Sequence, residues 1–544
     1  MFRRNWQVPA AYAALTLLMT WPLAVRGGDH QLGGGADPWL FIWTIGWNAH
    51  ALAQAPWAIF DANIFYPRGN TLAYSEHLIG SALLAAPVIW ITGNAVLGTN
   101  VAAGASVFLC ALGGYFLGRR LGLSRGGAFL CGLIFAFTPP RFGRIYQLHQ
   151  AAIYFVPFAL GFLHTYLRQG RARDLRRAAA MLSLQALTSG HGTALLVVGA
   201  AIMIAHHFLA GGALEWRKRL RDTGVAGVLL LVPAALLFIP YWRARRDAGL
   251  VRTLDDAGVT GSSWLATTSR VDTWLTSQLP PWPWRQAEPD VALFPGVLVL
   301  LLAAAGVVAA RRSRVAWLFL PMLLVTIWLT IGPPFGIWQF VSWIPGLNFI
   351  RVPSRFMLLG MLALAVLAAL GFERLAARLP RRQRIAAAAA AAVLLAAEFA
   401  SLPIDLRLHH IRPYPIDRWL DTVPKPFSLV EIPVPQSSLK PLVVRRHAEY
   451  MLHSMAHFQP IVQGYSGIEP PGFEALERAL MLFPDEKSLD ALAGMNVTYA
   501  VVHMDYFPPE LVEYAQAGLE RFEKDGRLRL VHTEGDGRLY AIVR

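Results

Sequence analysis

The sequence has few charged residues: they make up 15% of its 544 positions, whereas hydrophobic residues make up 55%. This composition, with a mean hydropathy of +0.41, excludes an ordinary soluble protein. Long apolar stretches recur from Val8 to Leu402, and they predict a chain that uses lipid as a solvent. After Pro403 the polarity is mixed. We therefore predict a transmembrane domain over residues 1–402 and a soluble domain over residues 403–544.

Cysteine is nearly absent, and so is a signal-peptide cleavage pattern. Cys110 and Cys131 both lie in apolar segments, so we expect packing residues and neither a disulfide framework nor a cysteine-based metal site. Arg3 and Arg4 precede an apolar run like that of a signal peptide, but no small-residue cleavage site follows. The first apolar segment is thus predicted to remain as a membrane helix.

The net charge of +15 does not indicate a nucleic-acid partner, because the arginines form short clusters between apolar segments. The positive-inside rule accounts for such clusters and places them in the cytoplasm. The clusters assigned to that side are Arg3/Arg4, Arg119/Arg120/Arg125, Arg168 to Arg177, Arg217 to Arg221, Arg311 to Arg314 and Arg374 to Arg384.

This distribution predicts a mainly α, polytopic protein of a bacterial inner (cytoplasmic) membrane, with about eleven transmembrane helices. One further apolar segment, Leu78 to Gly93, must be re-entrant or interfacial, since otherwise Arg119 and Arg120 would lie outside. The N-terminus is then cytoplasmic and the C-terminal domain extracytoplasmic. Arg243, Arg245 and Arg246 lie outside against the rule, although long loops obey it weakly. The predicted external loops are 26–77, 139–150, 189–191, 243–290 and 332–351.

Two apolar segments, Gly126 to Thr138 and Ala178 to Thr188, are shorter than the usual span of about 20 residues. Polar backbone at membrane depth is tolerated where it lines a cavity. The outer ends of both segments are therefore predicted to face a hydrated pocket. The alternative is that these helices are only tilted.

The first external loop contains Asp37, followed by Pro38 and Trp39, and several aromatic residues typical of helices lying along the membrane surface. A carboxylate at the mouth of a membrane cavity can act as a general base towards a hydroxyl or amine nucleophile. The alternative is that Asp37 caps the helix beginning at Pro38. Asp61, in the same loop, is a second candidate for the pocket.

Three histidines, His77, His149 and His191, lie at predicted outer membrane ends. Each is a candidate for holding a substrate or a divalent ion, and the alternative is a satisfied hydrogen-bonding role in the core. Glu76 joins these candidates because a carboxylate at a membrane boundary needs a partner or water. Glu398, inside an apolar helix, either pairs with an arginine or marks the outer end of that span.

Arg351 and Arg355 are four residues apart at the predicted outer N-terminus of a helix, with Pro353 suited to its first turn. Two guanidiniums on one face there, with the positive end of the helix dipole, would clamp a phosphate or pyrophosphate. The alternative is that both arginines extend to lipid headgroups.

The long loop 243–290 is predicted to act as a lid or to bind substrate.

The region after Pro403 predicts a small α/β domain. Strands are expected at Ser428 to Pro433 and Val497 to His503, and a hairpin at Leu528 to Val543. Helices are expected at Phe473 to Leu482 and Leu511 to Phe522. The turn Gln463–Gly467 is rich in glycine but lacks the context of a phosphate-binding loop or a nucleophile elbow.

These features resemble the C-type (GT-C) membrane glycosyltransferases, and the N-terminal half is most similar to the catalytic subunits of oligosaccharyltransferases. Asp37–Trp39 resembles their acidic first-loop motif, Phe65–Leu72 their approach to the next segment, and Ser189–Gly192 a turn of serine, aromatic and glycine. Residues 351–356 and 464–467 also resemble uncharacterised bacterial membrane proteins of this type. The resemblance implies a hexosyl or pentosyl transfer from a polyprenyl-(pyro)phosphate donor to a glycan, lipid or protein acceptor, with Asp37 as base or metal ligand.

The chain departs from that family in its second external loop, where Arg141, Arg144, Gln147 and His149 stand in place of acidic residues. This departure argues against metal dependence, and the cofactor stays unknown, with a divalent cation as the candidate. Two other hypotheses remain: a transporter or flippase of lipid-linked glycans, in which Asp37 is dispensable, and a membrane anchor for an active C-terminal domain. Many transporters contain two repeated halves, and this sequence shows no recognisable repeat, which argues against the transporter hypothesis.

Overall fold

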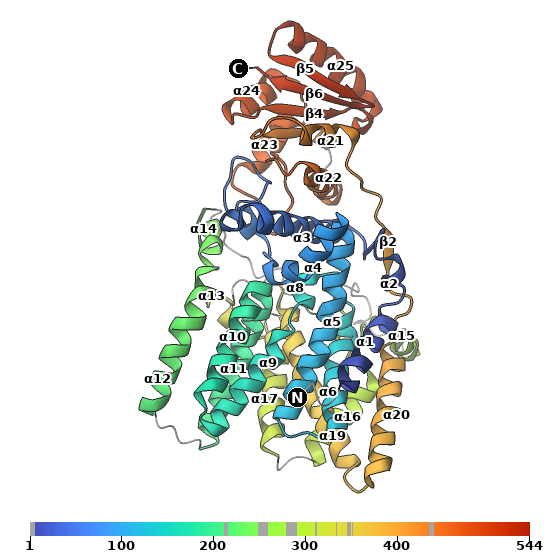
Figure 1. Cartoon of the computed structure of the whole chain (residues 1–544). Coiled ribbons are helices and arrows are strands. Elements are labelled where there is room, and N and C mark those ends of the chain that lie inside the picture. Colours follow the sequence, from blue (N-terminus) through green and yellow to red (C-terminus); the bar gives the residue numbers. More distant parts are fainter. Residues whose placement is uncertain are drawn as a thin grey trace.

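A computed structural model describes residues 6–211, 216–247, 259, 261–278, 291–309, 313–332, 334–344, 347, 350, 352–434 and 440–543. A helical bundle forms the lower part of the molecule and a small mixed domain caps one end (Figure 1). This arrangement confirms the predicted combination of a mainly α membrane part with a small α/β tail.

The bundle is built around α19 (Met357–Leu375), which is buried along nearly all its length. It packs against α6, α16 and α17. The long helices of the bundle are α1 (Gln7–Met19), α5 (Ala95–Arg120), α6 (Arg125–Phe137), α9 (Phe155–Gln169), α10 (Ala172–Thr188), α11 (Gly190–Leu209), α16 (Val297–Ala309), α17 (Arg314–Thr330) and α20 (Arg381–Phe399). Short helices connect them: α2 (Leu23–Arg26), α7 (Pro139–Phe142), α8 (Leu148–Ala151), α15 (Arg270–Ser277) and α18 (Trp338–Val341).

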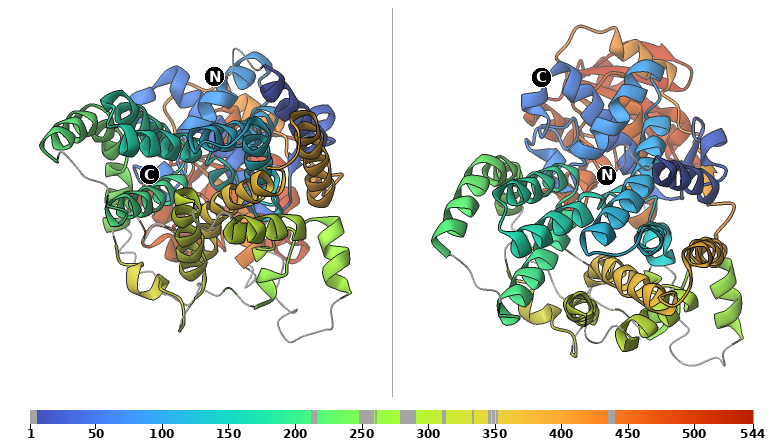
Figure 2. Two further views of the ribbon diagram at one scale, coloured as in Figure 1. Left: turned by 90° about the horizontal axis from the view of Figure 1, so that it is seen from below. Right: turned by 60° about the horizontal axis from the view of Figure 1, so that its bottom comes forward.

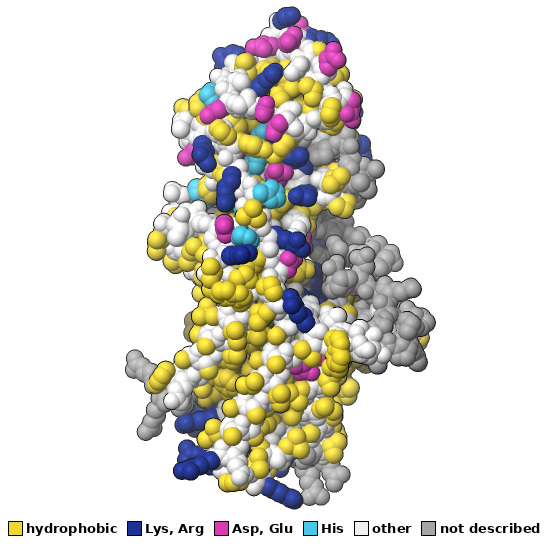
Figure 3. All heavy atoms as spheres, turned by 90° about the vertical axis from the view of Figure 1, so that its right-hand side faces the viewer, with side chains coloured by type: hydrophobic (Ala, Val, Ile, Leu, Met, Phe, Trp, Pro, Cys, Tyr) yellow, Lys and Arg dark blue, Asp and Glu magenta, His cyan; other side chains and the backbone are white. Residues whose placement is uncertain are grey.

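The chain is a polytopic membrane protein. Among the described residues, five helical stretches are long and apolar enough to cross a bilayer: 95–120, 148–169, 190–209, 219–247 and 353–375. Five shorter apolar helices accompany them. The side of the molecule in Figure 3 is mainly hydrophobic over its lower half, with Lys and Arg side chains at the lower end. The number of eleven crossings stays a prediction.

One membrane stretch lies at the edge of the bundle (Figures 1 and 2). It consists of α12 (Trp216–Ala226), the π-helical turn η4 (Gly227–Leu231), α13 (Val232–Leu236) and α14 (Ile239–Asp247). We call it the edge stretch. Its segments α12, η4 and α13 pack against α10, and α14 lies beside η3 (Thr71–Tyr74) of the first loop.

The predicted first external loop lies across the end of the bundle that bears the tail (Figure 1). Its helix α3 (Ala36–Gln54) runs over the ends of the spans in Figure 1, as the aromatic pattern predicted. The next helix, α4 (Ile79–Thr92), packs on α3 and α5. It has 14 residues, about as many as the bundle helices α1, α6 and α16, so the assignment of this segment as re-entrant or interfacial stays a prediction.

The tail contains a four-stranded sheet in the order β3-β4-β6-β5, with β3 and β4 parallel and the other pairs antiparallel. Its strands are β3 (Leu429–Ile432), β4 (Tyr499–His503), β5 (Leu528–Glu534) and β6 (Gly537–Ile542). Its helices are α21 (Pro415–Asp421), α22 (Lys440–His453), α23 (Phe473–Leu480), α24 (Glu486–Gly494) and α25 (Pro509–Lys524). The two predicted strands, the hairpin and the two predicted helices are confirmed.

The tail shares a hydrophobic core with the first loop. Trp43 of α3 packs in the same buried cluster as Tyr450 and Met451 of α22 and Leu429 of β3. In addition, β1 (His30–Leu32) of the first loop pairs with β2 (Leu406–Leu408), which follows the last bundle helix. The division at residue 402 therefore stays a prediction, since the two parts are packed together.

On the neighbouring strands β3 and β4, Glu431 and His503 form a buried pair, with His503 Nε2 2.6 Å from Glu431 Oε2. Burial raises the pKa of Glu431 to about 8, and burial also lowers the pKa of His503 to about 4. Both side chains are therefore neutral near pH 7 in the folded tail.

The tail is expected to lose stability between about pH 6.5 and 8. A carboxyl whose folded pKa is raised contributes stability that falls as pH rises from its unfolded pKa to its folded pKa. His503, with a lowered pKa, opposes this trend only below about pH 6.5. The slope is about 1.4 kcal/mol per pH unit for each proton released. Hydrogen exchange of β4 in the full chain measures it.

Glu431→Gln, which keeps a polar partner for His503, should reduce this slope, and the remainder is expected from Asp417, whose pKa burial also raises to about 8. Glu510→Gln, at an exposed position of α25, is the control and should leave the slope unchanged. Equal slopes in all three proteins would contradict the assignment to Glu431.

Candidate active site

A cavity of about 310 Å³ lies where the first loop, the bundle and the tail meet. Five residues predicted from the sequence line it together: Asp37, Glu76, His149, His191 and Arg355. The remaining lining residues are Leu40, Phe41, Ala73, Tyr74 and Ser75 from the first loop and Tyr465, Ser466, Gly467 and Ile468 from the tail. A cavity is thus present at the ends of the two short segments, where the sequence predicted one, since His149 and His191 line it.

Asp37 lies in the first turn of α3, where the positive end of the helix dipole favours a carboxylate. The residue at the N-cap is Gly35, with φ of 92°, and no side chain caps this helix. The alternative that Asp37 is the helix cap is therefore wrong. Instead, the Tyr465 hydroxyl donates a hydrogen bond of 2.6 Å to Asp37 Oδ1.

Tyr465 reaches Asp37 because its turn is held between the first loop and the sheet. Backbone hydrogen bonds join Phe65 N to Gln463 O (3.1 Å) and Ile461 N to Asn63 O (2.9 Å). The Gln463 side chain in turn accepts from Glu431 N (3.0 Å) of β3. A Cβ at Gly464 would lie 2.8 Å from the Phe65 ring, so this close approach requires glycine.

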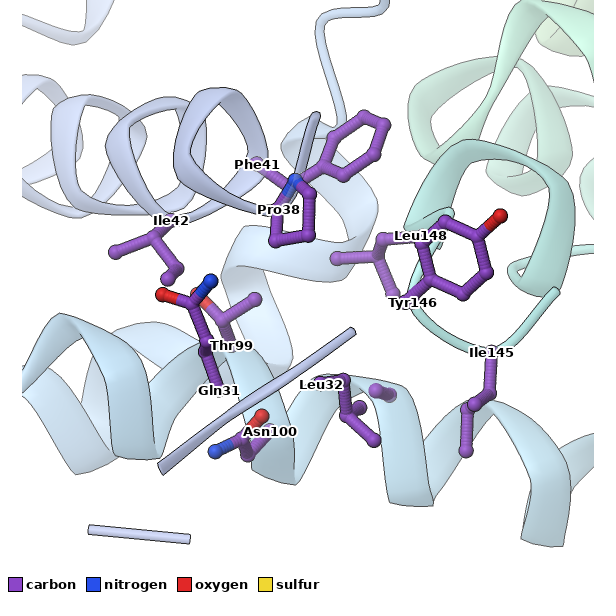
Figure 4. Close-up of a pocket in the computed structure, with 11 residues that line it drawn as sticks. Gln31, Leu32, Pro38, Phe41, Ile42, Thr99, Asn100, Ile145, Tyr146 and Leu148 are labelled. Carbon is purple, nitrogen blue, oxygen red and sulfur yellow. The ribbon is translucent and has the colours of Figure 1, made fainter. Parts of the chain in front are cut away.

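The first turn of α3 is also fixed from below. Figure 4 shows Pro38, Phe41 and Ile42 of α3 above Thr99 and Asn100 of α5, around a second cavity. That cavity measures about 10 Å³, which is no larger than a single water molecule needs. It is a packing gap that leaves the position of Asp37 well defined, and it has no room for a substrate.

Glu76 holds the start of α11. Its Oε2 accepts a hydrogen bond from Gly190 N (2.8 Å) and its Oε1 accepts one from His191 N (3.0 Å). Oε1 also contacts His191 Nδ1. A carboxylate at this place is stabilised by the free N–H groups of the helix N-terminus.

This contact fixes the orientation of His191 and, through it, that of Arg355. With the proton on Nδ1 facing Glu76, Nε2 of His191 is an acceptor. Arg355 NH1 lies 2.5 Å from this Nε2 and donates to it. Arg355 belongs to the turn η10 (Pro353–Phe356), which leads directly into α19, so Pro353 starts the helix as predicted.

His149 completes the wall of the cavity. Its ring lies 5.2 Å from the Phe41 ring and meets the His191 ring edge-on at 5.0 Å. Its backbone oxygen accepts a 2.6 Å hydrogen bond from the Ser189 hydroxyl. The two predicted segment ends, 139–150 and 189–192, are thereby joined at the site.

Three predicted residues lie elsewhere. His77 is fully buried behind the cavity, where its Nδ1 lies 2.7 Å from the Tyr241 hydroxyl and its Nε2 3.0 Å from Leu187 O. Asp61 is exposed and accepts from Asn70 N (2.8 Å) in a turn of the first loop. Glu398 accepts from Leu298 N (2.9 Å) at the start of α16. None of them lines the cavity.

Arg351, predicted as the partner of Arg355, lies outside the described residues, and so does half of the long loop 243–290. The predicted two-arginine clamp therefore stays a prediction. Within the described part, only the Arg355 half of that pair reaches the cavity wall.

The side chains present do not fit a metal ion. Both Glu76 oxygens are occupied by backbone N–H groups and by His191. Over the described residues, no group of three or more His, Cys, Asp or Glu side chains is placed to bind a metal. The chemistry considered below therefore uses no metal-bound step.

Sequence reasoning did not assign a role to Tyr465, although it noted the turn that carries this residue. Asp37 and Tyr465 are 428 positions apart, and no pattern in one sequence links two such distant residues. The one signal available was the glycine-rich turn itself, which here permits close packing on Phe65.

No protein-family model matches the chain, and no curated protein matches its sequence. Solved structures do match. The mycobacterial arabinofuranosyltransferase AftD aligns with 99% of the chain at a TM-score of 0.60 and 15% identity, and the match covers 40% of AftD. ArnT from Cupriavidus metallidurans in its apo state aligns over 100% of the chain and 99% of ArnT, at a TM-score of 0.52 and 13% identity.

The oligosaccharyltransferase AglB from Archaeoglobus fulgidus aligns less well, with a TM-score of 0.49 and 14% identity over 93% of the chain and 70% of AglB. At such low identities these matches describe the fold alone. From its first helix to its tail, the chain has the fold of the GT-C membrane glycosyltransferases.

Proposed function

We propose that the protein is a membrane glycosyltransferase that moves a sugar from a polyprenyl-(pyro)phosphate donor to an acceptor on the outer face of the inner membrane. The observation that carries the proposal is the single cavity in which Asp37 and Arg355 lie together. The fold supports it, since AftD is an arabinofuranosyltransferase.

Asp37 is the proposed general base. It accepts the proton of an acceptor hydroxyl or amine while that nucleophile attacks the anomeric carbon of the sugar. The Tyr465 hydroxyl occupies one lone pair of Oδ1 and so orients the carboxylate. The other oxygen, Oδ2, is then available for the acceptor.

Arg355 is the proposed partner of the leaving group. When the bond between the anomeric carbon and the phosphate oxygen breaks, one further negative charge develops on that phosphate. A guanidinium fixed before the charge appears stabilises it without reorganising. The contacts from Glu76 through His191 to Arg355 supply that fixed orientation.

The tail supplies part of the proposed acceptor side. Ser466, Gly467 and Ile468 line the cavity together with residues of the first loop and the bundle. A polar, partly open cavity of this kind suits a hydroxylated acceptor such as a glycan, a lipid or a protein side chain. The contribution of the tail argues against the hypothesis that the membrane part is only an anchor.

The proposed topology follows from the same arrangement. The cavity lies at the end of the bundle that bears the tail, whereas α12 and the connection between α19 and α20 lie at the opposite end (Figure 1). Arginines flank that connection, at Arg374 and Arg381. Eleven crossings with the arginines in the cytoplasm place the cavity outside, at the level where a lipid-linked sugar is exposed.

Asp37→Asn is expected to lower the rate of sugar transfer by about 10²–10⁴-fold, because the amide cannot accept the proton. Arg355→Ala is expected to lower it by about 10²–10³-fold. The measurement is release of labelled sugar from a polyprenyl-phosphate donor by purified protein. Asp61→Asn is the matched control, since that carboxylate is exposed and outside the cavity.

If Asp37→Asn and Arg355→Ala turned over as fast as the unaltered protein, the site assignment would be wrong. A flippase of lipid-linked glycans would instead tolerate Asp37→Asn and would move donor lipid across vesicle membranes without releasing sugar. The two functions are therefore distinguished by one pair of assays.

Tyr465→Phe is expected to slow transfer about tenfold or more, since a hydrogen bond to a charged group contributes about 1.5–3 kcal/mol. In the Asp37→Asn background the same substitution should have almost no further effect, because the two residues act as one unit. Tyr514→Phe, on the exposed face of α25, serves as control. Additive losses in the double variant would show that Tyr465 acts independently of Asp37.

A further inference from the structure

A groove of about 290 Å³ lies between α10 and the edge stretch, far from the candidate active site. Its walls are apolar and come from Ala180 of α10 and from Ala226, Leu229 and Leu230 of the edge stretch. Arg176 and Arg177 line the same groove. It therefore combines a hydrophobic slot with two adjacent guanidiniums.

The apolar part of the groove faces lipid. Leu229 is 65% exposed and Val228 is 67% exposed on the edge stretch, which is the most weakly buried of the five candidate spans. Small side chains at Ala180 and Ala226 leave the space between the two helices open. In a membrane, a lipid acyl chain fills an opening of this kind between helices, because the side chains that line an empty gap would lose van der Waals attraction.

The charged part lies near the helix starts. Arg176 is in the second turn of α10 and is exposed. Arg177 lies 3.7 Å from Asp174 and over the Phe162 ring at 5.7 Å, with its side chain 53% exposed. Within the described residues, no carboxylate lies within ion-pair distance of Arg176. The positive charge at the groove thus exceeds the negative charge beside it.

Arginine offers a planar fork of donors that matches phosphate oxygens, and it is less strongly hydrated than lysine. Basic pockets between transmembrane helices on the cytoplasmic side are where anionic headgroups bind. In the topology above, the starts of α10 and α12 are cytoplasmic, which places both arginines at the headgroups of the inner leaflet.

We propose that this groove binds an anionic phospholipid of the cytoplasmic leaflet. Its phosphate is held by Arg176 and Arg177, and an acyl chain lies along Ala180, Ala226 and Leu229. This inference does not depend on the proposed sugar transfer.

The bound lipid would seat the edge stretch against α10. The stretch is already joined to α10 by the hydrogen bond from the Ser183 hydroxyl to Leu230 O, within the π-helical turn. At its outer end Tyr241 contacts His77, the neighbour of Glu76. A lipid in the groove therefore stabilises the helix that supports one wall of the candidate active site.

The test is thermal unfolding of the purified full chain in detergent, with added dioleoyl phosphatidylglycerol, dioleoyl phosphatidylcholine or inorganic phosphate. Phosphatidylglycerol is expected to raise the unfolding temperature by about 2–4 °C more than phosphatidylcholine. Arg176→Gln/Arg177→Gln should lose most of that difference. Arg381→Gln/Arg382→Gln, an exposed arginine pair at the start of α20, should keep it.

A second variant, Ala180→Leu, narrows the slot without altering charge and should also weaken the effect of phosphatidylglycerol. Native mass spectrometry counts the lipid that remains bound in each variant. Equal stabilisation by phosphatidylcholine, an equal effect of inorganic phosphate, or an equal loss in the Arg381/Arg382 variant would each overturn the proposal. The first would exclude a preference for anionic lipid, the second a lipid ligand, and the third a site at this groove.

Discussion

The candidate site depends on the first external loop being held between the bundle and the tail. Backbone hydrogen bonds from Phe65 to Gln463 and from Ile461 to Asn63 hold the turn that carries Tyr465 against this loop. The shared hydrophobic core of α3 and α22 fixes the helix that carries Asp37. Without this packing, the Tyr465 hydroxyl of the tail would not reach the Asp37 carboxylate of the first loop.

The second organising element is the helix N-terminus of α11. The first turn of a helix leaves backbone N–H groups without partners in the helix, and at α11 Glu76 supplies the acceptor. That carboxylate orients His191, which accepts from Arg355. The carboxylate that satisfies the N-terminus of α11 therefore also fixes, through His191, the position of the Arg355 guanidinium at the cavity wall.

The two ends of the bundle differ in the chemistry that they offer. The end that bears the tail has a polar cavity with two carboxylates, two histidines and an arginine. The opposite end has an apolar groove with two arginines at a lipid-facing edge. In both proposals arginine binds a phosphate, but only the proposal for the cavity beneath the tail includes a general base.

The sequence alone determined the membrane class, the helical bundle, the α/β tail and five residues of the cavity, because apolar length, arginine clusters and polar residues at span ends are local signals. It did not separate His191 from His77, since both occupy span ends and only packing decides which ring faces the cavity. Only the tertiary structure showed that Tyr465 donates a hydrogen bond to Asp37 and that Asp37 is not the cap of its helix. Their contacts join residues hundreds of positions apart, and such contacts are set by how the tail docks.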